Sequence, residues 1–226
     1  MVPAAGIGAR MGAGLPKQYL PLNGRTVLEH SLWRLAACPG IAGIAVALAA
    51  QDAHWPQLAL PPDVAVHTTT GGAQRCHSVL NGLHALAGLA QDEEWVLVHD
   101  AARPCVRVAD IRNLMTYLAD HPVGGLLGVP VNDTVKRADS AATIIETVDR
   151  HGLWRALTPQ MFRYAALRCA LQDSIKAGVT VTDEASAMEW AGHAPRLVEG
   201  QGDNIKITRP EDLPLAAYFL QQQQSE

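Results

Sequence analysis

The sequence predicts an α/β fold with a twisted, mostly parallel, doubly wound sheet flanked by helices. Three observations predict it: apolar runs alternate with segments of helical periodicity, the connections between them are short, and the apolar run at 41–48 is continuous. A continuous run is typical of a strand buried on both faces of a parallel sheet. The chain has 226 residues, of which 48% are hydrophobic, enough for a full core. We therefore expect one domain over residues 1–226.

The elements are expected in the following order. A helix is predicted at about 26–37, because Thr26 and Glu29 have capping-box spacing and leucines follow at helical intervals. Strands are expected at 41–48, 64–68, 95–98 and 124–129. Helices are expected around 79–87, 111–118, 162–177 and 183–191, with a last helix capped at 208–211. In such a sheet, ligands bind beyond the carboxyl ends of the strands.

One segment departs from this alternation. Two β-prone runs, 134–138 and 143–148, flank a turn-like stretch at 139–142, which predicts a hairpin. An isolated two-stranded ribbon is only marginally stable in water, so the hairpin is either a decorated loop or an arm that packs on a partner. We favour an arm at about 130–152 that makes a homodimer.

Composition excludes several classes of protein. The net charge is −4 and no long Lys/Arg block occurs, which argues against a nucleic-acid partner. The longest apolar run, 41–50, falls short of the roughly 18 residues of a membrane span, and Arg10 interrupts any secretory signal core. The four cysteines have no Cys-x-x-Cys spacing, so neither a zinc site nor a disulfide framework is indicated. We expect a cytoplasmic protein.

The segment 3–11 is rich in glycine and small residues, with Arg10 inside it and Lys17 soon after. Such a turn lets backbone N–H groups approach a polyphosphate, and the two cations favour the same ligand. The spacing fits neither the Walker motif nor the dinucleotide G-x-G-x-x-G motif. We interpret the segment as a nucleotide triphosphate site; the alternative is a structural turn with two solvated cations.

Asp100 directly follows the predicted buried strand 95–98 and is expected at the carboxyl edge of the sheet. One carboxylate beside a triphosphate suffices for Mg²⁺, which prefers one or two carboxylates with phosphate oxygens and water. The alternative makes Asp100 a turn cap with Arg103 as its ion-pair partner. His99 is expected to be structural.

Three further segments carry candidates. The glycines of 71–78 could admit a flat base, or the segment is only a strand-to-helix turn with Ser78 in the first helical turn. Thr182 either belongs to a site or caps a helix in which two acids favour the dipole. Lys206 is a charge within an apolar alternation, so we expect it to point into a polar pocket.

These residues carry a resemblance that spans almost the whole chain. The blocks Pro-Ala-Ala-Gly-x-Gly-x-Arg-Met, Pro-Lys-Gln-Tyr, Val-His-Asp-Ala-Ala-Arg-Pro, Thr-Pro-Gln, Thr-Asp-Glu-Ala-Ser and Asp-Asn-Ile-Lys-x-Thr-x-Pro-Glu-Asp occur in order. Together they closely resemble the 2-C-methyl-D-erythritol 4-phosphate cytidylyltransferase family. The resemblance implies a Rossmann-like nucleotidyltransferase of the non-mevalonate isoprenoid pathway, which joins CTP to methylerythritol phosphate and releases pyrophosphate.

The resemblance also implies roles for individual residues. Catalytic roles fall on Arg10, Lys17, Arg150 and Lys206, and the Mg²⁺ ligand is Asp100. The nucleotide site comprises Pro3, Ala4, Ala5, Gly6, Gly8, Gly72, Ala73, Ser78 and Asp100, with cytosine recognised largely by backbone groups at Ala4, Ala5, Gly72 and by Ser78. Methylerythritol phosphate is expected near Ala101, Arg103, Thr158, Thr182 and Lys206. Its phosphate is expected to meet Thr134 and Arg150, which in the family come from the neighbouring subunit.

Two departures from the family pattern bear on these roles. Ala73 stands where an acidic or amide residue is usual, which puts base discrimination in question. Only Met1 and Val2 precede Pro3, so the first strand is either short or begins upstream of the chosen start site.

Rival functions are kept open. One is a ribitol 5-phosphate cytidylyltransferase, which shares the triphosphate site and the arm. Another is a nucleotide-binding module without catalysis, which the joint presence of Arg10, Lys17, Asp100 and Lys206 disfavours. A dinucleotide oxidoreductase is disfavoured by the glycine spacing.

Overall fold

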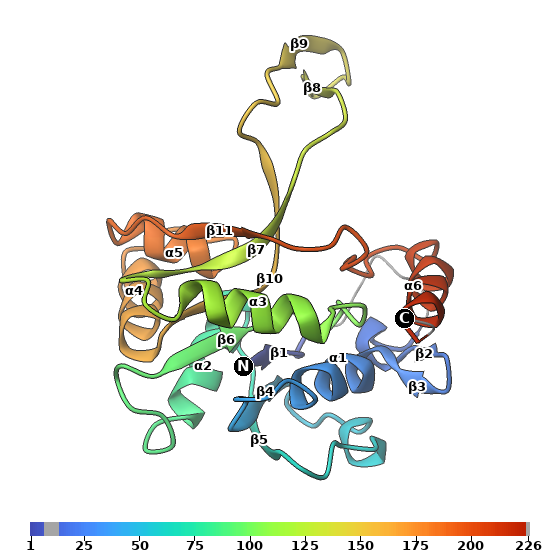
Figure 1. Cartoon of the computed structure of the whole chain (residues 1–226), viewed down its shortest axis with the longest axis vertical. Coiled ribbons are helices and arrows are strands. Elements are labelled where there is room, and N and C mark those ends of the chain that lie inside the picture. The colour runs from blue at the N-terminus through green and yellow to red at the C-terminus, as the bar shows by residue number, and fades with distance from the viewer. Residues whose placement is uncertain (7–13, 225–226) are drawn as a thin grey trace.

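Helices cover both faces of a layer of strands (Figure 1). The structure is a computed structural model and describes residues 1–6 and 14–224. The helices are α1 (Val27–Ala36), α2 (Arg75–Ala85), α3 (Val108–Leu118), α4 (Tyr164–Lys176), α5 (Glu184–Trp190) and α6 (Asp212–Gln222), with short 3-10 helices η2 (Lys17–Tyr19) and η3 (Trp55–Gln57). The strands are β1 (Val2–Pro3), β2 (Pro21–Leu22), β3 (Arg25–Thr26), β4 (Gly43–Leu48), β5 (Ala65–Thr70), β6 (Trp95–Val98), β7 (Gly124–Pro130), β8 (Val135–Ala138), β9 (Ile144–Val148), β10 (Trp154–Arg163) and β11 (Arg196–Glu199).

Two sheets lie edge to edge in the central layer. One has the order β1-β4-β5 with parallel pairing throughout, and the other has the order β11-β7-β10-β6. The N–H of His99 donates to the carbonyl of Met1 at 3.0 Å, which joins β6 to the edge formed by β1. The α/β fold with helices on both faces is therefore confirmed.

β10 differs from the sequence expectation. The helix predicted at 162–177 begins only at Tyr164, and the residues before it form a long strand antiparallel to both β6 and β7. Pro159 lies inside this strand, and proline argues against a central strand because it cannot donate a ladder hydrogen bond. The structure accommodates it where the register shifts between Ala156 and Gln160. This is why the sequence pattern hides the strand.

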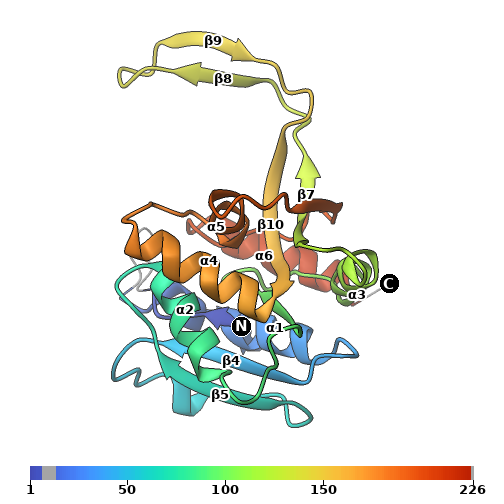
Figure 2. The ribbon, with the colours of Figure 1, turned by 90° about the vertical axis from the view of Figure 1, so that its left-hand side faces the viewer.

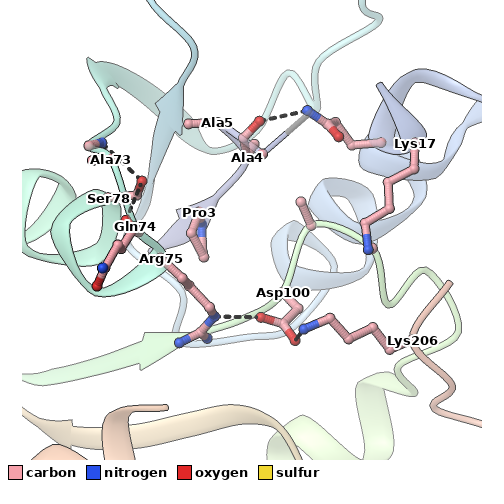
Figure 3. A pocket seen from close by; sticks show the side chains of 15 residues that line it. Pro3, Ala4, Ala5, Lys17, Ala73, Gln74, Arg75, Ser78, Asp100 and Lys206 are labelled. Carbon is pink, nitrogen blue, oxygen red and sulfur yellow. Dashed lines mark hydrogen bonds and ion pairs between the residues drawn. The ribbon is translucent and has the colours of Figure 1, made fainter. Parts of the chain in front are cut away.

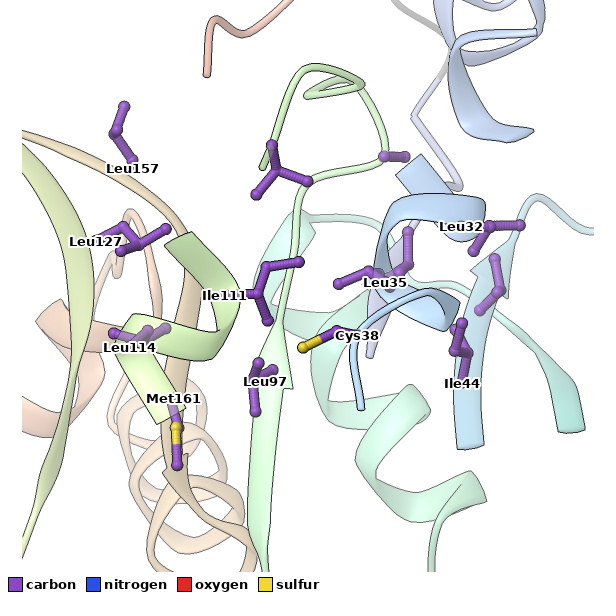
Figure 4. Close-up of a cluster of buried hydrophobic side chains, with 14 of the residues drawn as sticks. Leu32, Leu35, Cys38, Ile44, Leu97, Ile111, Leu114, Leu127, Leu157 and Met161 are labelled. Carbon is purple, nitrogen blue, oxygen red and sulfur yellow. The ribbon is translucent and has the colours of Figure 1, made fainter. Parts of the chain in front are cut away.

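The helices enclose the sheet with two large apolar clusters. α1 and α3 pack on one face through residues such as Leu32 and Leu114, as Figure 4 shows. α2, α4 and α5 pack on the other face, around Phe162. A smaller cluster holds α6 against the start of α1. Within the described residues, no helix is long and apolar enough to cross a membrane.

The predicted hairpin is present and projects from the body. β8 and β9 pair antiparallel, and both views show them far from the sheet at the end of two extended connections (Figures 1 and 2). The side chains of Ile144 and Ile145 are exposed, at 61% and 62%. The hairpin therefore makes little contact with the rest of its own chain.

Candidate active site

A pocket of about 440 Å³ lies where the segments after β1, β5 and β6 meet (Figure 3). Its volume is usual for a small-molecule site. It brings together the predicted residues Pro3, Ala4, Ala5, Gly6, Lys17, Gly72, Ala73, Ser78, Asp100, Ala101 and Lys206. The predicted Gly8 and Arg10 lie outside the described residues.

Asp100 is buried and has a cation on each carboxylate oxygen. Oδ1 lies 3.0 Å from Nε of Arg75, and Oδ2 lies 2.9 Å from Nζ of Lys206 and 3.4 Å from Nε of Arg103. Burial alone would raise the pKa of Asp100, but these three cations outweigh it and hold that pKa well below its usual range. Asp100 is therefore an ionised carboxylate at neutral pH.

Arg75 was not predicted from the sequence. It is the first residue of α2, lines the pocket, and makes two hydrogen bonds to Glu184, at 2.6 and 3.0 Å. Glu184 was interpreted only as an acid near a helix N-terminus, yet it is fully buried. The available signal was a lone arginine within the otherwise small and polar segment 71–78.

Lys17 and Lys206 both line the pocket, as the prediction requires. The ammonium of Lys17 donates to the carbonyl of Ile207 at 2.8 Å, which fixes it beside the segment that carries Lys206. Around Asp100, the charges of Arg75, Arg103 and Lys206 exceed those of Asp100 and Glu184 by one. With Lys17 added, the pocket is suited to an anionic ligand.

The side chain of Ser78, in α2, holds the loop that was predicted to receive a base. The N–H of Gly72 donates to Oγ of Ser78 at 3.0 Å, and that hydroxyl donates to the carbonyl of Gln74 at 3.2 Å. A Cβ at Gly71 would lie 2.4 Å from Cβ of Ala5, so the two nucleotide segments pack directly against each other. Ser78 acts in this structure by shaping the loop.

The hydroxyl of Thr158 is hydrogen-bonded to both His99 and Asp100. His99 Nε2 is 3.1 Å from the carbonyl of Arg103, which can only accept, so Nε2 carries the proton and Nδ1 accepts from the Thr158 hydroxyl at 3.0 Å. The Thr158 oxygen in turn accepts from the N–H of Asp100 at 3.1 Å. The only hydroxyl proton of Thr158 is thus already donated, and the side chain is buried.

Arg103 and Thr182 are not among the residues that line the pocket. Arg103 pairs with Asp100, as the structural alternative proposed, and also donates to the carbonyl of Asn204 at 2.7 Å. Thr182 is not the cap of α5; Asp183 is, because its carboxylate accepts from the N–H of Ser186. The N–H of Thr182 donates to the hydroxyl of Ser186.

Thr134 and Arg150 stand apart from the pocket of their own chain. Both are exposed and belong to the connections that carry the hairpin, which lead away from the body (Figure 2). Arg150 donates to the carbonyl of Asn132 across these connections, at 2.5 Å. Neither residue is among those that line the pocket.

The chain is similar to known proteins over almost its whole length. A family profile described as 2-C-methyl-D-erythritol 4-phosphate cytidylyltransferase (IspD) matches residues 1–222. A protein of that name from Pseudomonas fluorescens strain SBW25 is 57% identical over 214 residues, covering 94% of this chain and 91% of the relative. One from Pseudomonas syringae pv. syringae strain B728a is 54% identical over 227 residues, covering 100% of this chain and 94% of the relative.

Solved structures agree with the sequence relatives. The Francisella tularensis protein of the same name superposes with a TM-score of 0.83 at 35% identity, covering 96% of this chain and 97% of that one. A 4-diphosphocytidyl-2C-methyl-D-erythritol synthase gives a TM-score of 0.82 at 38% identity, covering 97% and 96%. The chain belongs to the 2-C-methyl-D-erythritol 4-phosphate cytidylyltransferase family.

Proposed function

We propose that this chain transfers CMP from CTP to 2-C-methyl-D-erythritol 4-phosphate and releases pyrophosphate. The observation that carries the proposal is the cationic pocket in which Lys17, Lys206 and Asp100 meet the two glycine-containing segments. The family membership of the whole chain supports the same reaction. Of the rival functions, the family match favours neither a ribitol phosphate enzyme nor a silent module.

We propose one orientation for the nucleotide in the pocket. The loop of Gly72 and Ala73 offers backbone groups beside Ala5, a surface suited to a flat base. The triphosphate then extends toward Lys17 and the cations around Asp100, where its negative charge is neutralised. Because the side chain at 73 is a methyl group, recognition of cytosine relies on the backbone.

The transfer needs no covalent enzyme intermediate. An oxygen of the acceptor's phosphate, already anionic at neutral pH, attacks the α-phosphorus of CTP in line. The new P–O bond forms as the bond between the α-phosphorus and the bridging oxygen breaks, and pyrophosphate leaves with that electron pair. Catalysis is then positioning and charge stabilisation, for which we propose Lys17, Lys206 and Arg10.

We propose that Mg²⁺ enters this site on the triphosphate. Asp100 has one donor on Oδ1, which leaves an oxygen lone pair for a metal, but three cations surround the carboxylate. Among the described residues, no group of three or more His, Cys, Asp or Glu side chains is arranged to hold a metal. The donor set therefore fits a metal with mainly phosphate and water ligands. Such an ion supplies charge neutralisation during the transfer.

We also propose that the hairpin arm makes a homodimer that completes each site. The exposed Ile144 and Ile145 provide an apolar surface that folding of a single chain does not bury. Thr134 and Arg150 would then reach the partner's acceptor phosphate.

The four cysteines are free thiols, which is compatible with a reducing cytoplasm.

Pyrophosphate release tests the proposed function. The purified protein is assayed with CTP, Mg²⁺ and methylerythritol phosphate, and then with ribitol 5-phosphate or with ATP, GTP or UTP in place of the proposed substrates. We expect turnover only with CTP and methylerythritol phosphate together. Preferred turnover on ribitol 5-phosphate would support the rival enzyme, and no turnover on any pair would support the silent module.

A further inference from the structure

Glu184 is a buried carboxylate that lies just outside the pocket. Its residue exposure is 0%, and it is not among the pocket-lining residues. It stands in the first turn of α5, and both of its oxygens accept from the guanidinium of Arg75, at 2.6 and 3.0 Å. A ligand in the pocket would meet Arg75 and not Glu184.

Arg75 connects Glu184 to Asp100. Because the guanidinium is planar, two bonds to Glu184 fix both the plane and the direction of the remaining Nε–H. That N–H donates to Oδ1 of Asp100 at 3.0 Å. Figure 3 shows Arg75 and Lys206 reaching Asp100 from opposite sides. One guanidinium thus connects the Asp100 carboxylate to a carboxylate outside the pocket.

We propose that Glu184 is a positioning residue for the transfer reaction, which acts by holding Arg75 so that Asp100 keeps one fixed orientation toward the nucleotide. This inference rests on the proposed function. It assigns to Glu184 no contact with substrate.

The electrostatics agree with this role. Burial raises the pKa of Glu184 above its usual value, and the charge and two hydrogen bonds of Arg75 offset part of that rise. Without the Glu184 charge, Arg75 has one carboxylate left within reach. Its fork would then turn to hold both oxygens of Asp100, in competition with Lys206 and with any metal on the nucleotide.

Glu184→Gln tests this directly, because it keeps the side-chain length and removes the charge. We expect kcat to fall roughly ten-fold to a hundred-fold, by analogy with residues that orient a ligand-binding side chain. We expect KM for CTP to change by less than about three-fold, since the backbone of Gly72 is held by Ser78 and not by Glu184. Glu184→Asp, which restores the charge but shortens the reach, should recover part of kcat.

Arg75→Lys and the double variant show whether Glu184 acts through Arg75. If it does, adding Glu184→Gln to Arg75→Lys should lower kcat no further. Arg107→Lys is a matched control, because Arg107 is 26% exposed against 27% for Arg75 and also pairs with an aspartate, Asp203. It should lower the melting temperature without lowering kcat. Assays are run well below the melting temperature of every variant.

A second readout does not depend on turnover. In a crystal structure of Glu184→Gln, we expect Arg75 to contact both oxygens of Asp100. We also expect calorimetry in the presence of EDTA to give the same CTP affinity as in the unmodified protein. A normal kcat with only a lowered melting temperature would reduce Glu184 to a structural role and overturn the proposal. If Glu184→Gln does not fold, additive losses in Glu184→Asp and Arg75→Lys overturn it equally. Absence of turnover in the unmodified protein would instead refute the proposed function. The crystal structures of the unmodified protein and of Glu184→Gln would still show whether Glu184 sets the orientation of Asp100.

Discussion

Nζ of Lys206 lies 2.9 Å from Oδ2 of Asp100. The two residues come from distant parts of the chain, one after the apolar strand β6 and one from a loop near the C-terminus. Both residues line the same pocket. Lys206, for which we propose a catalytic role, is therefore in contact with Asp100, for which we propose a contact with Mg²⁺.

Replacement of Lys206 by Ala should lower kcat by about a hundred-fold, because it removes a cation that we propose stabilises the charge developing on the phosphate. Pyrophosphate release measures the effect. Lys176→Ala, at the exposed end of α4, is the control and should retain full activity. Equal kcat in the two variants would remove Lys206 from the transition state.

Gly71→Ala should weaken CTP binding by about ten-fold, since overpacking of this kind costs one to a few kcal/mol. The new Cβ would lie 2.4 Å from Cβ of Ala5 and 2.9 Å from Oγ of Ser78, which forces apart the two nucleotide segments. Calorimetry with CTP measures the change. Gly43→Ala, where the nearest atom lies at an ordinary 3.5 Å, should bind CTP normally. Unchanged affinity in Gly71→Ala would show that this packing does not shape the base site.

Thr158→Val should destabilise the fold by about 1–3 kcal/mol, because the N–H of Asp100 loses its acceptor and Nδ1 of His99 loses its donor. Denaturant unfolding measures the free energy, with Thr158→Ser as the control that keeps the hydroxyl. A variant of full stability with a raised KM for the sugar phosphate would instead assign Thr158 to substrate binding.

His99 should make the protein less stable in acid. Burial lowers its pKa from the usual value of 6.5 to about 4, so between these values the unfolded chain binds the proton and the folded chain does not. The free energy of unfolding contributed by His99 is present above pH 6.5 and is lost as the pH falls toward 4. Denaturant unfolding at pH 7 and pH 5 should therefore show a smaller acid loss in His99→Gln than in the unmodified protein or in His151→Gln, an exposed control. Equal losses would show that His99 titrates normally.

The arm predicts complementation between two inactive variants. Arg150→Ala removes a group proposed to serve the partner's site, whereas Lys206→Ala damages the site of its own chain. A mixed dimer would hold one intact site, so random mixing should restore about a quarter of full activity. Sedimentation of an Ile144→Asp variant should show monomers. No recovery on mixing, with each variant dimeric, would contradict a shared site.

Local sequence patterns predicted those site residues that stand out against their neighbours in the sequence. Asp100 follows a continuous apolar run, and Lys206 interrupts an apolar alternation, so each stood out without knowledge of its neighbours. Arg75 and Glu184 did not, because their significance lies in a contact between α2 and α5 that no sequence spacing encodes. Strand β10 was hidden by Pro159, which the register shift accommodates.

A crystal structure with CTP and Mg²⁺ tests the central claim most directly. We expect cytosine against the backbone of Gly72 and Ala73, and the α-phosphate within hydrogen-bond reach of Lys17 or Lys206, on the side of the pocket that holds Asp100. A nucleotide bound elsewhere, or one whose α-phosphate lies away from both lysines, would contradict the account.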